Sequence, residues 1–191
     1  MRVGLFFGSF NPIHIGHLII ANTVAESDIV DEVWFVISPQ NPFKKKKTLL
    51  HEFDRYDMVK LAIDDNPHLR ASDIEFNLPK PSYTIDTLTY LSEKYPKHQF
   101  KIILGEDNLT NFHKWKNYEQ ILSYYGLIVY PRPFVDPSPI LQEPNVTMIE
   151  APKIDISATF IRNAIQEGRT IRYLLPDSVI ELIQRKKFYQ D

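Results

Sequence analysis

The chain has 191 residues, 43% of them hydrophobic, which is enough to bury the core of one domain. Its formal net charge of −2 excludes the overall basic field that nucleic-acid-binding proteins usually carry. The absence of cysteine excludes disulfides, thiolate metal sites and a cysteine nucleophile, and leaves a hard ion such as Mg²⁺ as the expected metal. No membrane-length apolar run or signal-peptide pattern is present, so we expect a cytoplasmic protein that binds neither nucleic acid nor a membrane.

Strand-like and helix-like segments alternate along most of the chain. The predicted strands are residues 2–8, 32–38, 70–76, 100–105, 125–131 and 146–152. The predicted helices between them are residues 17–28, 52–66, 84–95 and 117–125. This alternation predicts an α/β, Rossmann-like fold with a doubly wound parallel sheet, followed by a small C-terminal helical cap. We expect a single domain over 1–191, with an α/β core at 1–152 and a C-terminal helical subdomain at 153–191.

The stretch GSFNPIHIGH, residues 8–17, lies between the first predicted strand and the first predicted helix. Ligands of parallel α/β sheets bind at the carboxyl ends of the strands, where this stretch lies. Glycine permits close approach of a ligand to the backbone, and the N–H groups of a helix N-terminus attract phosphate. His14 and His17 are three positions apart, so their imidazoles lie on one face of the first helical turn. The residues therefore indicate a phosphate site, in which imidazole donates hydrogen bonds to the anion.

Two other interpretations of the histidine pair remain open on the residues alone. His14 and His17 could be metal ligands, although no third ligand is evident nearby and the glycine turn would then be unexplained. They could also be structural histidines with satisfied hydrogen bonds.

GSFNPIHIGH is similar to the GxFxPxHxGH signature of the adenylyl- and cytidylyltransferase superfamily, and ISATFIR, residues 156–162, is similar to its second signature, ISSTxIR. PSYTIDTL (81–88), GEDNL (105–109) and the tryptophan of FHKWKNYEQI (112–121) narrow the resemblance to the bacterial nicotinate mononucleotide adenylyltransferases, over residues 1–190. The resemblance implies transfer of the adenylyl group of Mg·ATP to nicotinate mononucleotide in NAD biosynthesis. Nicotinic acid adenine dinucleotide and pyrophosphate would form by direct in-line attack, without a covalent intermediate.

The resemblance also implies roles for individual residues. Its catalytic residues would be His17 on the α-phosphate, His14 on the phosphate chain, and Lys44 from the run KKKK at 44–47, with a register uncertain by one or two residues. Backbone N–H groups near Thr84 would bind the pyridine carboxylate and Trp115 would stack on the pyridine, so the nicotinate mononucleotide site would comprise Ser82, Tyr83, Thr84 and Trp115. The ATP site would comprise Gly8, Ser9, Phe10, Gly16, Gly105, Asp107, Arg132, Ser157, Thr159 and Arg162.

Several of these residues also have ordinary structural interpretations. Ser82, Thr84, Asp107 and Ser157 could be helix N-caps, Arg162 an exposed side chain, Trp115 a core residue, and KKKK a solvated loop. The chain also departs from the family pattern. Phe43 stands where the family often has histidine, and Ala158 replaces a serine of the second signature. In the first signature, Ser9 and Asn11 replace the commoner pairing of glycine or threonine with aspartate.

Alternatives to this function also remain open. The acceptor could be nicotinamide mononucleotide, because a carboxamide has nearly the shape of a carboxylate, or it could be phosphopantetheine. A non-catalytic nucleotide- or RNA-binding regulator on the same fold is the alternative from a different class. The sequence does not determine the oligomeric state, and a homo-oligomer is one possibility.

Overall fold

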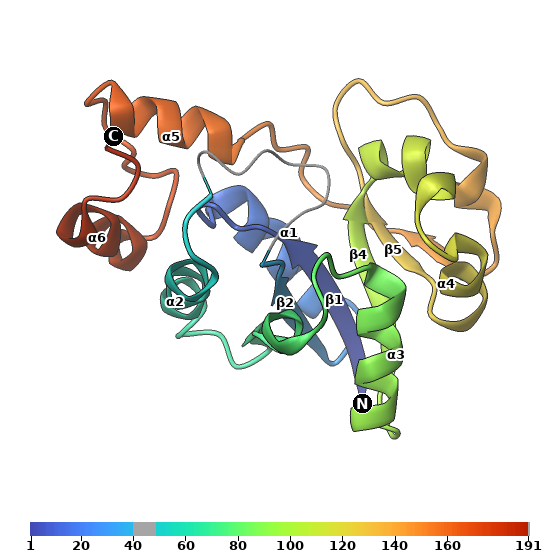
Figure 1. The fold of residues 1–191 in the computed structure, drawn as a ribbon. Coiled ribbons are helices and arrows are strands. Elements are labelled where there is room, and N and C mark those ends of the chain that lie inside the picture. Colours follow the sequence, from blue (N-terminus) through green and yellow to red (C-terminus); the bar gives the residue numbers. More distant parts are fainter. Residues whose placement is uncertain (40–48, 191) are drawn as a thin grey trace.

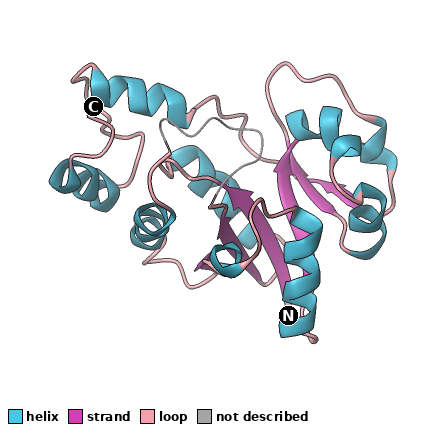
Figure 2. Cartoon of the chain, viewed as in Figure 1, coloured by secondary structure: helices cyan, strands magenta, loops and turns pink. Residues whose placement is uncertain are grey.

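The computed structural model describes residues 1–39 and 49–190. Six parallel strands form one sheet, in the order β3-β2-β1-β4-β5-β6 (Figures 1 and 2). The strands are β1 (Arg2–Gly8), β2 (Glu32–Ile37), β3 (Leu69–Ser72), β4 (Gln99–Gly105), β5 (Leu127–Tyr130) and β6 (Val146–Met148). Because β1 pairs with both β2 and β4, the strand order reverses at β1, where open α/β sheets bind their ligands. The predicted fold class is confirmed.

Helices cover both faces of the sheet because the side chains of successive strand residues point to opposite faces. Phe6, Phe35 and Ile103 lie in one hydrophobic cluster, to which α1 (Ile15–Ala25) and α2 (Glu52–Ala62) contribute. Leu5 and Trp34, which precede Phe6 and Phe35 in the sequence, point to the opposite face of the sheet and lie in a second cluster. That cluster includes residues of α3 (Thr84–Lys94), α4 (Tyr118–Tyr124) and the 3₁₀ helix η3 (Glu106–Lys114).

The C-terminal helices α5 (Ala158–Gln166) and α6 (Asp177–Lys186) pack on the same side as α1 and α2 (Figure 1). Ile161 of α5 and Val179 and Ile183 of α6 are buried in the first cluster. The apolar periodicity of both helices therefore serves a core that is shared with the α/β part of the chain. The division at residues 152 and 153 remains an expectation.

Three strand predictions were too long, and the strand expected at 125–131 covers only Leu127–Tyr130. The strand expected at 70–76 ends at Ser72, and Ile74–Asn77 form the 3₁₀ helix η2. In η2, Glu75 is only 2% exposed and its carboxyl oxygens accept hydrogen bonds from hydroxyl groups near the start of α3. The strand expected at 146–152 ends at Met148. A further 3₁₀ helix, η4 (Pro139–Gln142), lies in the proline-rich segment between β5 and β6.

Across the described residues, no helix has the length and hydrophobicity that crossing a bilayer requires.

Candidate active site

The turn after β1 is built around a buried aromatic ring. Phe10 is 2% exposed, adopts a φ of 44°, and packs edge-on against the ring of His17 at 5.1 Å between centroids. A Cβ atom at Gly8 would lie 2.7 Å from the Phe10 ring, so only glycine fits at the end of β1. The Phe10 side chain is therefore part of the core, and its backbone alone is left for the predicted contact with ATP.

His14 and His17 lie side by side at the start of α1. Their rings stack with centroids 3.7 Å apart at an angle of 25°, and the His14 backbone N–H donates to His17 Nδ1 at 3.3 Å. His14 is 5% exposed, and its Nδ1 has no hydrogen-bond partner among the described residues. Burial, with a smaller effect from the Arg132 guanidinium, lowers the pKa of His14 to about 4. His14 is thus neutral at pH 7, and its ring carries no positive charge.

One of the first-turn N–H groups of α1 is already used. The Ile15 N–H donates to the carbonyl of Leu174 at 2.9 Å, so the expectation that this helix start presents unpaired N–H groups is wrong at that position. The cause is the return of the C-terminal segment to α1, which the local sequence does not reveal.

Gly16 and Arg132 complete the surroundings of the histidine pair. A Cβ at Gly16 would lie 3.1 Å from His14 Nδ1, so the bare backbone lets the His14 ring pack closely. Arg132, after β5, donates from Nη1 to the Ile154 carbonyl at 3.2 Å. Its Nε lies 3.4 Å from Asp107 Oδ1, an ion-pair distance without hydrogen-bond geometry. A small hollow of about 20 Å³ is lined by both histidines, Gly16 and Arg132.

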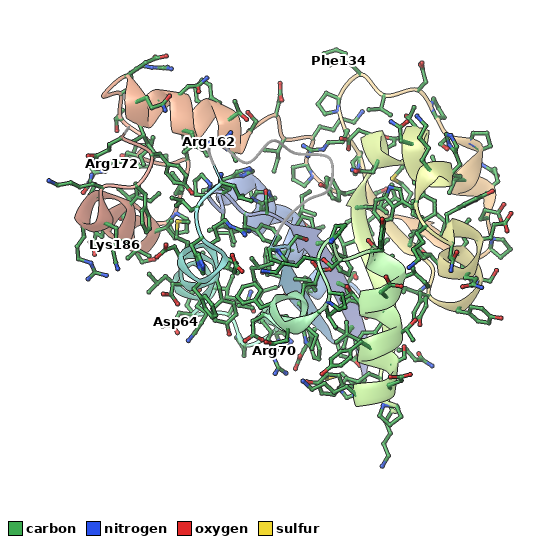
Figure 3. All side chains as sticks on the ribbon, in the orientation of Figure 1. Asp64, Arg70, Phe134, Arg162, Arg172 and Lys186 are labelled. Carbon is green, nitrogen blue, oxygen red and sulfur yellow. The ribbon has the colours of Figure 1, made fainter. Side chains whose placement is uncertain are left out.

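The second motif is tied to the first. Ser157 caps α5, since its Oγ accepts from the Phe160 N–H at 3.2 Å, and its N-cap interpretation is therefore confirmed. Arg162 donates to the Asn11 carbonyl at 2.8 Å and to Thr159 Oγ1 at 3.1 Å, so it is not an ordinary exposed side chain. Figure 3 labels Arg162 beneath α5, on the side toward the sheet.

Asn11 forms hydrogen bonds with residues from distant parts of the chain. Its Oδ1 accepts from the Tyr189 hydroxyl at 2.8 Å and from the Leu50 N–H at 3.2 Å. Asn11 is 5% exposed, and burial raises the pKa of Tyr189 above its ordinary value. The neutral phenol is therefore the form that donates this bond.

A larger pocket, of about 630 Å³, opens on the other side of the β1 turn. Its lining brings together seven of the residues predicted for the two substrates, namely Gly8, Ser9, Ser82, Tyr83, Thr84, Asp107 and Trp115. Trp115 is half-buried and faces this pocket, which argues against its interpretation as a plain core residue. Gly105 lies at the end of β4, and a Cβ there would lie 2.4 Å from Asp107 Oδ1, so a larger residue would displace the Asp107 carboxylate.

The start of α3 forms one wall of this pocket. The N-cap is Tyr83 and no side chain caps the helix, so the interpretation of Ser82 or Thr84 as the N-cap is wrong. The Ser82 hydroxyl donates instead to Glu75 at 3.0 Å. Burial of Glu75, which also lines the pocket, raises the pKa of its carboxyl group. Asp107 is likewise not an N-cap, because η3 is preceded by Gly105.

Comparisons with known proteins identify the family of the chain. A family model described as Cytidylyltransferase-like matches residues 5–164. A protein of Cytophaga hutchinsonii named "Probable nicotinate-nucleotide adenylyltransferase" is 61% identical over 191 residues, covering all of both chains. A protein of the same name from Flavobacterium johnsoniae is 51% identical, again over all of both chains. The chain belongs to the nicotinate-nucleotide adenylyltransferase family.

The fold is shared with a solved structure of this family at low sequence identity. The Plasmodium falciparum nicotinic acid mononucleotide adenylyltransferase complexed with NaAD superimposes with a TM-score of 0.84 at 21% identity, covering 98% of this chain and 97% of that one. At 21% identity, this structural similarity is evidence for the fold alone.

One predicted catalytic residue lies outside the described part of the chain. Lys44, with Phe43 and the other lysines of 44–47, belongs to residues 40–48, so its contact with phosphate remains a prediction.

Arg55, which is completely buried on α2, is not among the residues predicted from the sequence. Its guanidinium donates to four backbone carbonyls, those of Ser9 (2.6 Å), Ser38 (2.9 Å), Pro39 (3.2 Å) and Leu50 (2.9 Å). Arg55 thereby joins the turn after β1 to the end of β2. The available signal was its position in the helix: Arg55 shares the inward stripe with Met58, Val59 and Ala62, where a charged residue is unexpected.

Proposed function

We propose that the protein transfers the adenylyl group of ATP to nicotinate mononucleotide. An oxygen of the 5′-phosphate of the mononucleotide attacks the α-phosphorus of ATP, a new P–O bond forms, and the bond to the bridging oxygen breaks. The products are nicotinic acid adenine dinucleotide and pyrophosphate. The reaction passes directly between substrates in line, and the protein contributes orientation and charge stabilisation.

One observation carries this proposal: the stacked pair His14 and His17 lies at the start of α1, directly after the turn that joins two sides of the candidate site. On one side, Gly8 and Ser9 line the pocket of about 630 Å³ that Trp115 also lines. On the other, Arg162 of the second motif donates to the carbonyl of Asn11. Two anionic substrates bound on the two sides would meet at the histidines, as an in-line transfer requires.

The phosphate chain of ATP would lie along the second side. His17 would donate to the α-phosphate, where charge builds up during transfer, and neutral His14 would donate to the neighbouring phosphate oxygens. Arg132, Ser157, Thr159 and Arg162, with Lys44, would bind the phosphates that leave as pyrophosphate. Gly16 allows the backbone of α1 to approach them closely, and Phe10, Gly105 and Asp107 border the nucleoside.

The acceptor would occupy the larger pocket. The uncapped first turn of α3, at Thr84, suits the pyridine carboxylate because helix N-terminal N–H groups attract anions. The cationic pyridinium ring would stack on Trp115, a contact that contributes about 0.5–2 kcal/mol. Ser82 and Tyr83 complete this end of the pocket.

Magnesium belongs to the substrate in this scheme. Within residues 1–39 and 49–190, no three His, Asp or Glu side chains are grouped as a metal site. The ion would enter the site with the substrate as Mg·ATP, where it offsets the charge of the phosphates.

The test is release of pyrophosphate from Mg·ATP with nicotinate mononucleotide, nicotinamide mononucleotide or phosphopantetheine as acceptor. We expect the highest kcat/KM with nicotinate mononucleotide, and a loss of at least about 10²-fold in His17→Ala, the size typical for one removed charge-stabilising donor. Preference for the amide would reassign the acceptor. ATP binding without turnover of any acceptor would contradict the proposal and favour a non-catalytic nucleotide-binding protein.

A further inference from the structure

Glu75 is a buried acid that the proposed reaction leaves without a role. It lies in η2, between β3 and α3, is 2% exposed, and lines the same pocket as Trp115 and Thr84. A buried carboxyl group is costly unless it is fully hydrogen-bonded, so its placement at the wall of the acceptor pocket needs an explanation.

Both oxygens of Glu75 are engaged by hydroxyl groups that flank the start of α3. Ser82 Oγ donates to Oε2 at 3.0 Å, and Thr87 Oγ1 donates to Oε1 at 2.7 Å. Ser82 stands two residues before Thr84, the first residue of α3, and serine hydroxyls at this spacing commonly accept from the backbone N–H two positions ahead. Here the hydroxyl faces Glu75, and α3 has no side-chain cap.

We propose that Glu75 is a positioning residue that keeps the first turn of α3 open to the acceptor, because it holds the Ser82 hydroxyl away from the backbone N–H groups there. The inference rests on the proposed function and deepens it. An open helix start offers full hydrogen bonds to a carboxylate, whereas a start capped by serine offers fewer. Glu75 would therefore favour the acid mononucleotide over the amide without contacting either one.

A second contact supports the same picture. Asp86 is the acidic residue of the first turn of α3, and its charge would compete with an anionic acceptor. Lys116 Nζ lies 3.0 Å from each of its carboxylate oxygens and 4.8 Å from the centre of the Tyr83 ring. The competing charge is thus paired by a residue that itself lines the pocket.

The test begins with Glu75→Ala, which frees the Ser82 hydroxyl. We expect KM for nicotinate mononucleotide to rise about tenfold, the equivalent of one displaced charge-assisted hydrogen bond. KM for ATP should stay unchanged, and the preference for the acid over the amide should shrink. Glu75→Gln should remain close to the wild type, because its amide group still engages the Ser82 hydroxyl.

A rescue experiment separates this role from a purely structural one. Adding Ser82→Ala to Glu75→Ala removes the hydroxyl that would cap α3, so KM for nicotinate mononucleotide should fall back by several-fold. If Glu75 only supports the fold, removal of a second side chain cannot restore KM. Should Glu75→Ala fail to fold, the same pair is made with Glu75→Leu, which fills the space without accepting a hydrogen bond.

The outcomes are distinct. An unchanged KM in Glu75→Ala, or no recovery in the double variant, overturns the inference while the wild-type activity stands. Absence of transfer to nicotinate mononucleotide in the wild type overturns the proposed function itself.

Discussion

Arg162 of the second motif donates a hydrogen bond to the backbone carbonyl of Asn11 in the first motif, across 151 positions of the chain. The two signatures are therefore parts of one hydrogen-bonded unit. The same guanidinium reaches Thr159 Oγ1 at 3.1 Å, so its planar fork holds α5 against the turn after β1.

Replacement of Arg162 tests whether its hydrogen bonds between the two signatures matter for activity. In Arg162→Lys a single ammonium group cannot hold Asn11 and Thr159 together, so we expect kcat/KM for ATP to fall about 10- to 100-fold. Steady-state kinetics with varied ATP measure the effect. Arg169→Ala is the matched control, since that exposed arginine pairs with Glu167 beyond the end of α5. Wild-type kinetics in Arg162→Lys would show that the hydrogen bonds of Arg162 are not needed for activity.

The buried guanidinium of Arg55 should matter chiefly for stability. Arg55→Leu leaves the carbonyls of Ser9, Ser38, Pro39 and Leu50 without this donor, and we expect a loss of at least about 3 kcal/mol in the free energy of unfolding. Urea unfolding provides the measurement.

Arg70→Leu is the comparison for Arg55. Arg70, labelled in Figure 3, is exposed. Its guanidinium lies 4.7 Å from the centre of the Trp34 ring, so its loss should cost less than about 1 kcal/mol. Equal effects of the two substitutions would show that the buried network is not what stabilises the strand ends.

His14 makes stability depend on pH. Its pKa is about 4 in the folded protein, below the value near 6.5 of an exposed histidine, so the unfolded chain binds the proton more tightly. The resulting contribution, of about 3 kcal/mol, is complete above pH 6.5 and is lost as the pH falls toward 4. His14→Gln should remove this dependence.

The measurement is the difference in unfolding free energy between wild type and His14→Gln from pH 7 to 4. Taking the difference isolates His14 from Glu75, whose raised pKa acts in the opposite direction, lowering stability as pH rises. A constant difference across this range would contradict the burial of a neutral His14.

Tryptophan fluorescence should report acceptor binding. The chain has two tryptophans, of which Trp34 is 2% exposed in the core and Trp115 lines the pocket. Nicotinate mononucleotide should quench Trp115 by stacking, and Trp115→Phe should abolish the change while leaving the Trp34 emission. Retention of the full change in Trp115→Phe would place the acceptor elsewhere.

Much of the architecture was predictable because it follows local patterns. The alternation of apolar runs and helical spacing gave the order of strands and helices, and the spacing of His14 and His17 correctly predicted that both rings share one face. The ordered pair of signatures predicted the family. These features depend on residues that are near neighbours in sequence.

The remaining features depend on contacts between distant residues. The use of the Ile15 N–H by Leu174 and the four carbonyls bound by Arg55 involve segments that local patterns do not relate. The burial of Glu75 was not predicted because an acidic residue in an alternating run is expected to be exposed. The hydroxyl groups of Ser82 and Thr87 offset the cost of its burial, and they come near Glu75 only when α3 has packed beside η2.

The hydrogen bond between Tyr189 and Asn11 also bears on synthesis of the protein. Asn11 is translated before all three of its partners, because Leu50, Arg162 and Tyr189 follow 39, 151 and 178 positions later. The first motif is thus synthesised well before all of the contacts that hold it can form. A nascent or prematurely terminated chain lacking residue 189 would carry both signatures without the complete set of contacts that fixes one against the other.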